Sequence, residues 1–229
     1  MRIATWNVER IKRKAHLDML SAECERIGAD ILVLTETDKR LCPDFKYRHE
    51  TPLMAAIQPS LYTPTENRVS VYTNYPCVRQ HKTYDEASSL CVELETERGS
   101  LLVYGTIVGI YGNRHSSFAE ELKRQAADIS RLSRLGDGIC ICGDFNCSFS
   151  DSYYFTKLGQ NIFLKTFAQN DIHLLTADAP ECIDHIAITA RLVGNSPVHI
   201  EEWNIDKKLS DHKGIMAELC ENEVTHHEG

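Results

Sequence analysis

The hydrophobic pattern changes twice within the first forty residues, from that of a strand to that of a helix and back to that of a strand. Residues 2–6 are predicted to form a short strand, and from Leu17 to Ile27 apolar residues recur every three or four positions, the period of an amphipathic helix. Gly28 then supplies a helix stop. Residues 31–34 are a continuous apolar run, which is typical of a strand buried on both faces. We therefore predict the order strand, helix, strand.

Two strands in the middle of the chain are predicted to form an antiparallel hairpin. Residues 88–96 and 100–111 are both rich in strand-forming residues, and only three residues separate them. Residues 68–74 alternate like a half-exposed strand, within a proline-punctuated span, residues 42–76, that we expect to be ordered but irregular. Residues 77–87 match no pattern. A mixed sheet in a protein of class α/β is implied.

The clearest helix is predicted for residues 116–132. Ser117 and Glu120 have the spacing of a capping box at its start. Its apolar face consists of Phe118, Leu122, Ala126, Ile129 and Leu132. Strands are then expected at residues 139–142 and 182–189, with a helix-like region between them, and a polar turn runs into the last strand within residues 210–219.

Length and composition favour one domain. The chain has 229 residues and 42% hydrophobic content, so we expect a single domain over residues 1–221 and a polar tail over 222–229. The formal charge of −8 excludes the broad positive field of sequence-independent nucleic-acid binders. Nucleic acid stays open as a substrate, because a divalent cation would offset a carboxylate cluster.

Cysteine usage favours a reducing compartment. The nine cysteines are an odd number and contain no C-x-x-C pair, which fits neither a complete disulfide framework nor a zinc ribbon. No apolar stretch approaches the length of a membrane span. We expect a cytoplasmic protein with no membrane span and no obligate protein partner.

Unusual polar residues stand at or beside the ends of the apolar runs. They are Asn7, Glu36, Asp144, Asn146, Asp184, Asp211 and His212. Ligand sites form at strand ends because the strands converge there while the loops carry polar groups. Carboxylates and amides without thiolates suit Mg²⁺ or Mn²⁺ better than Zn²⁺. A histidine held by an acid can act as a general base or as a donor to phosphate charge, so metal-assisted phosphoester hydrolysis is the leading reaction class.

Five motifs carry a resemblance to a known family: TWN at 5–7, LTET at 34–37, GDFN at 143–146, IDHI at 183–186 and SDH at 210–212. In this order they resemble the endonuclease/exonuclease/phosphatase superfamily, which has the deoxyribonuclease I-like fold. The resemblance implies a four-layer α/β sandwich of two facing mixed sheets flanked by helices. It also implies a divalent-metal active site, with Mg²⁺ or Mn²⁺, at one end of the sandwich.

The resemblance further implies roles for the motif residues. Glu36 would be the principal metal ligand, with Asn7 and Asp211 nearby. Asp144 would align or deprotonate the attacking water, and the sequence leaves open whether Asp144 or His212 is the base.

At the phosphate, the resemblance implies contacts from two side chains. His212 would contact the scissile phosphate and be oriented by Asp184, and Asn146 would bind a phosphate oxygen. The pattern departs from that of many relatives in one place. Where they carry a tyrosine or histidine in a pattern like N-T-H-L, this chain has GTIV at 105–108.

One of four residues of the same region is expected to substitute for the side chain that is absent there. Tyr111, Asn113 and His115 are the predicted substrate-binding residues, and Tyr104 is a further candidate.

The leading functional hypothesis is a metal-dependent nuclease or phosphodiesterase. A small or single-stranded nucleic acid would fit both the compact length and the negative charge. One alternative is a phosphatase or phosphodiesterase acting on a small phosphorylated or lipid head-group substrate. Another, from a different class, is a binding module on the same fold that has lost turnover.

Several other residues have a simpler structural interpretation. We expect His185 to pack inside the protein and Cys140 and Cys142 to pack as small apolar side chains. Trp203 is expected in the core or at its rim, with base stacking as the alternative. The basic residues within 10–14 are expected on a solvated helix face.

Overall fold

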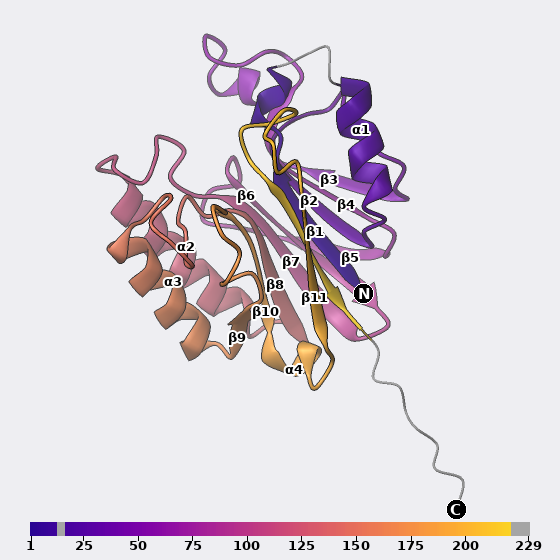
Figure 1. The fold of residues 1–229 in the computed structure, drawn as a ribbon, viewed down its shortest axis with the longest axis vertical. Coiled ribbons are helices and arrows are strands. Elements are labelled where there is room, and N and C mark those ends of the chain that lie inside the picture. Colours follow the sequence, from indigo (N-terminus) through magenta and orange to yellow (C-terminus); the bar gives the residue numbers. More distant parts are fainter. Residues whose placement is uncertain (13–16, 221–229) are drawn as a thin grey trace, which may run out of the picture.

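Two six-stranded sheets face each other in the computed structural model, which describes residues 1–12 and 17–220 (Figure 1). The predicted tail at 222–229 therefore lies outside the described residues, as do Arg13 and Lys14 of the basic run. Arg10 does not lie on a solvated helix face. Its guanidinium pairs with Glu66 at 2.7 Å and lies over the Tyr62 ring, because the chain there forms the short 3-10 turn η1 (Glu9–Ile11).

The first sheet has the strand order β11-β12-β1-β2-β4-β3. Its strands are β1 (Arg2–Asn7), β2 (Ile31–Asp38), β3 (Tyr47–Glu50), β4 (Glu66–Thr73), β11 (Val198–Trp203) and β12 (Gly214–Leu219). Strand β1 pairs in parallel with β2 and antiparallel with β12, so the sheet is mixed.

The second sheet has the order β5-β6-β7-β8-β10-β9. Its strands are β5 (Cys77–His81), β6 (Ser89–Thr96), β7 (Gly99–Ile107), β8 (Gly138–Asp144), β9 (Ile172–Leu174) and β10 (Asp184–Thr189). The predicted hairpin is present as β6 and β7, and β7 runs parallel to β8.

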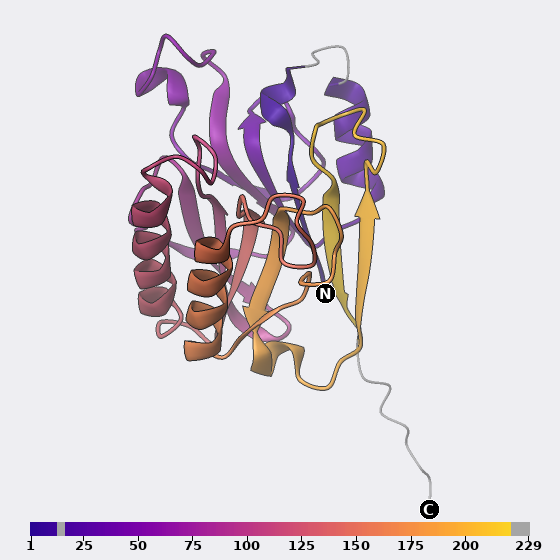
Figure 2. The ribbon, with the colours of Figure 1, turned by 60° about the vertical axis from the view of Figure 1, so that its left-hand side comes forward.

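Helices cover the outer faces of both sheets. They are α1 (Leu17–Arg26), α2 (Phe118–Leu132) and α3 (Lys157–Gln169). The short α4 (Ala190–Val193) instead contributes Leu192 and Val193 to the core between the sheets, and a further 3-10 turn is η3 (Met54–Ala56). Figure 2 shows α2 and α3 side by side against the second sheet and α1 on the far side of the first. No helix in the described part of the chain has the length and apolar character of a membrane span.

Three separate apolar cores hold these layers together. Val33 and Val103 belong to the core between the two sheets. Ile141 and Phe118 belong to the core between the second sheet and its helices, and Leu20 to the core beneath α1. Three cores separate four layers, which confirms the predicted four-layer α/β sandwich.

Edge strands were not predicted. Strands β3, β11, β5 and β9 have no counterpart in the sequence analysis, and each forms the edge of a sheet. An edge strand is covered less completely than a central one, so its side chains need not follow an apolar pattern. Strand β5, for example, has no buried residue.

Two predicted element boundaries were also wrong. The second strand of the hairpin ends at Ile107 rather than at 111, because Gly109 and Gly112 have φ values of +70° and +84° that leave the extended conformation. Strand β2 continues past the predicted end at 34 to Asp38.

The predicted capping box is absent. Ser117 has helical dihedral angles and makes no capping hydrogen bond; its hydroxyl donates to Glu121 Oε1 at 2.5 Å instead. The side chain that does cap a helix is Thr156, which accepts a hydrogen bond from Gly159 N at 3.2 Å at the start of α3.

Candidate active site

The predicted site residues gather at one end of the sandwich, where the two sheets are joined by polar side chains. Strand register brings them there. Asn7 ends β1 beside β2, and Asp144 at the end of β8 lies directly opposite Asp184 at the start of β10. His212 comes from the segment just before β12 in the first sheet.

The first link between the sheets joins Asn7 to Asp144. Asn7 Nδ2 donates to Asp144 Oδ2 at 3.1 Å, and the other carboxylate oxygen accepts from Asn146 N at 2.8 Å. Asp144 is only 2% exposed. Burial raises the pKa of this carboxyl to about 7, although the nearby His212 charge opposes the shift.

The second link joins His212 to Asp184. His212 Nδ1 and Asp184 Oδ2 are 2.6 Å apart, and Asp184 is buried. Burial by itself would lower the pKa of His212, but the Asp184 charge and hydrogen bond, together with the Asp144 and Asp211 charges, outweigh it and raise the pKa to about 10. An imidazolium is therefore stabilised at this position.

The backbone around His212 is fixed by three other side chains. The indole of Trp6 and the amide of Asn204 both donate to the His212 carbonyl, at 3.1 and 2.6 Å. Ser210 Oγ accepts from His212 N at 3.2 Å and donates to Asn7 O at 2.6 Å. Ser210 and Asn204 were not predicted. Ser210 is the first residue of the SDH motif, which marked this segment in the sequence, but neither residue was named as a site residue.

Glu36 is the best candidate in the site for binding a cation. It has φ +45° within β2, between the paired residues Thr35 and Thr37, and its carboxylate makes no hydrogen bond to any described residue. Burial raises the pKa of Glu36, and the charge of nearby Asp211 adds to that shift. A partly buried carboxylate that makes no hydrogen bond to a described residue and lies near a second acid fits a bound cation.

The other expected metal ligands complete an oxygen-donor set. Asn7 Oδ1 accepts from Glu9 N at 2.9 Å and keeps a second lone pair, and the Asp211 side chain is 61% exposed. Within residues 1–12 and 17–220, no three His, Cys, Asp or Glu side chains form a metal-binding group by themselves. Glu36, Asp211 and the Asn7 amide provide the hard oxygen donors that suit Mg²⁺ or Mn²⁺.

Asn146 also sits in the site with a left-handed backbone, at φ +49°. Its Nδ2 donates to Val108 O at 2.8 Å. The preceding Gly143 is required by packing, since a Cβ there would lie 1.9 Å from Thr106 O. The GDFN turn thus combines a glycine that lets β8 approach β7 closely with a strained residue held beside the Asp144 carboxylate.

The predicted substrate-binding residues divide into two groups. Asn113 reaches the site, where its Nδ2 donates to Asn146 O and Tyr154 O at 3.1 and 3.2 Å. Tyr111 and His115 are exposed, and their rings contact each other in a tilted arrangement with centroids 5.0 Å apart, but neither lines the hollow beside His212.

Tyr104 does not take the place of the absent phosphate-contacting residue. It is completely buried beneath α2, and its hydroxyl contacts Asp128. In the segment GTIV at 105–108, which differs from the pattern of the relatives, Thr106 accepts a hydrogen bond from Gln125 of α2, and Ile107 packs in the core between the sheets. The described structure therefore places no aromatic or histidine side chain of residues 105–108 at the site.

A hollow of about 240 Å³ opens beside His212 and contains residues that the sequence analysis missed. The lining residues are Asn146, Tyr153, Tyr154, Glu181, Ile183, Asp184, Lys207, Asp211, His212 and Lys213. Tyr153 and Lys207 lie in loops without a motif, so their sequence carries no signal; only the folding of two loops toward each other brings them to the site.

The residues given a structural interpretation are indeed buried. His185 bonds Thr176 and the Cys147 carbonyl, at 2.9 and 3.0 Å, and burial lowers its pKa to about 4. Cys140 and Cys142 pack in the core between the sheets, and Trp203 packs edge-on against Trp6. These interpretations are confirmed.

Known structures share this fold. An AP endonuclease from Archaeoglobus fulgidus superposes with a TM-score of 0.70 at 14% identity, covering 96% of this chain and 99% of that chain. The AP endonuclease LMAP from Leishmania major gives a TM-score of 0.70 at 16% identity, with 96% and 88% covered. The 3′ phosphatase NExo from Neisseria, bound to a product DNA hairpin, gives 0.65 at 15% identity, with 96% and 100% covered.

Sequence comparison identifies the family. No curated protein sequence matches the chain. Residues 4–212 match the sequence model of the Endonuclease/Exonuclease/phosphatase family, and the matched range contains every residue of the polar cluster described above. The chain therefore belongs to the endonuclease/exonuclease/phosphatase family and is a phosphoester hydrolase.

Proposed function

We propose that this hydrolase is a divalent-metal-dependent nuclease or phosphodiesterase that acts on nucleic acid. The observation that carries the proposal is the pair of buried links between the sheets, Asn7 to Asp144 and His212 to Asp184. Together they place a carboxylate of raised pKa and a stabilised imidazolium at one end of the fold, which is the pairing that phosphoester hydrolysis requires.

Glu36, Asn7 and Asp211 would hold the metal, Mg²⁺ or Mn²⁺. The Glu36 carboxylate, which makes no hydrogen bond to a described residue and lies near Asp211, supports this assignment. The cation would supply positive charge that stabilises the phosphate oxygens in the transition state.

Asp144 is the proposed base and His212 the proposed phosphate donor. With a pKa raised to about 10, His212 is protonated at neutral pH and has no lone pair to accept a proton. The pKa of Asp144, at about 7, instead suits a group that takes a proton from water. Asp184 orients the imidazolium, and Asn146 would bind a phosphate oxygen.

Three observations bear on the substrate and the cellular setting. The solved neighbours include two AP endonucleases and a 3′ phosphatase bound to DNA, which favours nucleic acid. The charge of −8 and the hollow of about 240 Å³ favour a small or single-stranded substrate over a long duplex. All nine cysteines are unpaired, which fits a reducing cytoplasm.

The second candidate is hydrolysis of a small phosphoester. The small volume of the hollow also favours it, because a single head group would fill such a space. On either hypothesis residues 1–221 would act as one domain.

The test is hydrolysis of bis-(p-nitrophenyl) phosphate, p-nitrophenyl phosphate and single-stranded and duplex DNA, with Mn²⁺, Mg²⁺ or EDTA. We expect metal-dependent cleavage of DNA that is lost in Asp144→Ala and in His212→Ala. The exposed Asp178 and His173 provide matched controls, Asp178→Ala and His173→Ala, which should retain activity. Cleavage of the monoester alone would favour the small-substrate hypothesis. A folded protein without turnover on any substrate would contradict both and indicate a binding module.

A further inference from the structure

Two loops meet at the mouth of the hollow beside His212. One loop, between β8 and α3, contributes Tyr153, and the other, between β11 and β12, contributes Lys207. Lys207 Nζ donates to the Tyr153 hydroxyl at 2.7 Å and lies 4.3 Å from the centre of its ring. The pair therefore bridges the two loops on the rim of the site that contains His212.

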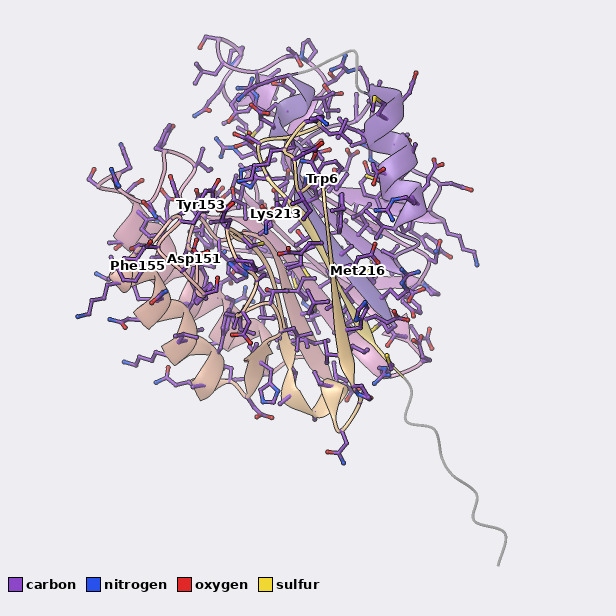
Figure 3. The ribbon with its side chains drawn as sticks, in the orientation of Figure 1. Trp6, Asp151, Tyr153, Phe155, Lys213 and Met216 are labelled. Carbon is purple, nitrogen blue, oxygen red and sulfur yellow. The ribbon has the colours of Figure 1, made fainter. Side chains whose placement is uncertain are left out.

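The Tyr153 loop holds its aromatic ring in an exposed position. Tyr153 is 47% exposed, yet its backbone N–H donates to Asp151 Oδ1 at 2.9 Å, and Asp151 Oδ2 accepts from Glu181 N at 2.6 Å. The next residue, Tyr154, donates its N–H to Ser148 Oγ at 3.0 Å. Figure 3 shows Tyr153, Asp151 and Phe155 grouped on this loop. An apolar ring held exposed by an ordered loop is typical of a binding surface.

The Lys207 loop is tied to the catalytic segment. Lys207 N donates to Asn204 O at 2.9 Å, and the Asn204 side chain donates to the carbonyls of Ser210 and His212 at 2.9 and 2.6 Å. Leu209 N donates back to Asn204 Oδ1 at 3.0 Å. The position of the Lys207 backbone is thus coupled to that of His212, the residue proposed to contact the phosphate.

An aromatic face and an ammonium beside a phosphate-binding site match the chemistry of one nucleotide unit. Bases stack on tyrosine rings without sequence preference, and lysine binds the neighbouring phosphate as a point charge. Such stacking requires an exposed base face. A base inside a duplex has both faces covered by its stacked neighbours, whereas an unpaired base can turn out and expose one. The hollow of about 240 Å³ is smaller than a usual ligand pocket of roughly 300–1,000 Å³, so it has room for a single unit.

We propose that Tyr153 and Lys207 are the specificity-determining pair of this enzyme. They bind the unpaired nucleotide next to the scissile phosphate, with its base on the Tyr153 ring and its phosphate near Lys207 Nζ. This inference rests on the proposed nuclease function, and it narrows the substrate to an unpaired nucleic-acid strand.

The test distinguishes the role of the Tyr153 ring from that of the Lys207 charge. It uses a substrate without bases, which keeps the phosphates for Lys207 but offers nothing to stack on Tyr153. Two labelled single strands of equal length and equal phosphate number are compared, an oligothymidine and an oligomer of abasic tetrahydrofuran units. In Tyr153→Ala, we expect the factor by which KM rises to be about ten times larger for the oligothymidine than for the abasic strand. We expect the effect in KM and not in kcat. Tyr153→Phe, which keeps the ring, should restore most of the preference for the base-bearing strand.

Lys207→Ala should raise KM for both strands, since both carry the same phosphates. Lys208→Ala is the matched control: it removes the same charge from the next residue, whose ammonium pairs with Asp206 and which does not line the hollow. We expect it to leave both KM values unchanged. None of the three side chains is buried, and comparing Tm of each variant with that of the wild type excludes a folding defect.

The outcomes distinguish this inference from the function on which it rests. An equal rise in KM for both strands in Tyr153→Ala, or no change, would overturn the stacking role while the nuclease function stands. An effect of Lys208→Ala equal to that of Lys207→Ala would overturn the role of Lys207. If the wild-type enzyme cleaves neither strand with Mn²⁺ or Mg²⁺ but hydrolyses a small phosphoester, the nuclease proposal itself fails.

Discussion

His212 and Asp184 belong to different sheets, and their side chains meet with Nδ1 and Oδ2 2.6 Å apart. Asp184 begins β10 in the second sheet, and His212 precedes β12 in the first. Because Asp184 is 1% exposed, its charge acts on the imidazole with little screening by water. The contact therefore sets both the orientation and the charge of the histidine.

Asp184→Asn should separate orientation from charge. The amide keeps the shape and one acceptor but removes the charge that raises the pKa of His212, so a smaller fraction of His212 is protonated at neutral pH. We expect kcat to fall on the order of 100-fold, and the loss of activity at high pH to begin at a lower pH. A pH–rate profile measures both effects. The exposed Asp44 supplies the control, Asp44→Asn, which should leave the profile unchanged. An unchanged profile in Asp184→Asn would contradict the role of Asp184 in raising the pKa of His212.

Glu36→Gln should weaken metal binding. The substitution keeps the size of the side chain and removes the charge of the unpartnered carboxylate. We expect Mn²⁺ affinity to fall on the order of 10-fold or more, measured by calorimetry on the protein without substrate. The same change at exposed Glu95 on β6, Glu95→Gln, should leave the affinity unaltered. Equal affinities of wild type and Glu36→Gln would remove Glu36 from the metal site.

His185 should make the protein less stable as the pH falls. Its folded-state pKa, about 4, lies below the ordinary value of 6.5, so between these values the unfolded chain binds a proton that the folded protein does not. Stability is therefore lost as pH drops below about 6.5, and the loss levels off near pH 4 at about 3 kcal/mol. Urea unfolding of wild type and His185→Gln at pH 7 and pH 5 measures this loss of unfolding free energy. The variant should lose less stability between the two pH values, and equal losses would show that other groups cause the effect.

Thr156→Ala and Ser117→Ala test which helix start is capped by a side chain. Thr156 accepts a hydrogen bond from the backbone of α3, so its removal should lower the free energy of unfolding by about 1 kcal/mol. Ser117 makes no such bond at the start of α2, and we expect a smaller loss. Thermal unfolding at fixed pH compares the loss of stability in the two variants. A larger loss in Ser117→Ala would restore the capping box indicated by the sequence.

The central strands and the polar cluster could be predicted because they follow local rules. Buried strands such as β2 and β8 need continuous apolar runs, and polar residues directly after such runs stand out. Edge strands such as β5 are not covered on every side, so they tolerate polar residues and leave no comparable signal.

The capping box failed for a different reason. Ser117 and Glu120 have the expected spacing, but Ser117 has helical dihedral angles, φ −74° and ψ −20°, whereas the N-cap residue of a capping box is extended. Its hydroxyl donates to Glu121 Oε1, and the other oxygen of that carboxylate accepts from Gly109 N at 2.8 Å. Spacing along the chain does not reveal the backbone conformation at Ser117.

The sequence by itself determined which chemical groups this protein has and that they lie at strand ends, since residue type and hydrophobic period are local properties. Only the tertiary structure decided which groups meet. Asn7 and Asp144 are 137 positions apart, and they touch because the apolar core between the sheets sets β1 and β8 against each other. The left-handed backbone of Glu36 and the contact of Tyr153 with Lys207 likewise arise from packing, which acts between segments that the chain order keeps apart.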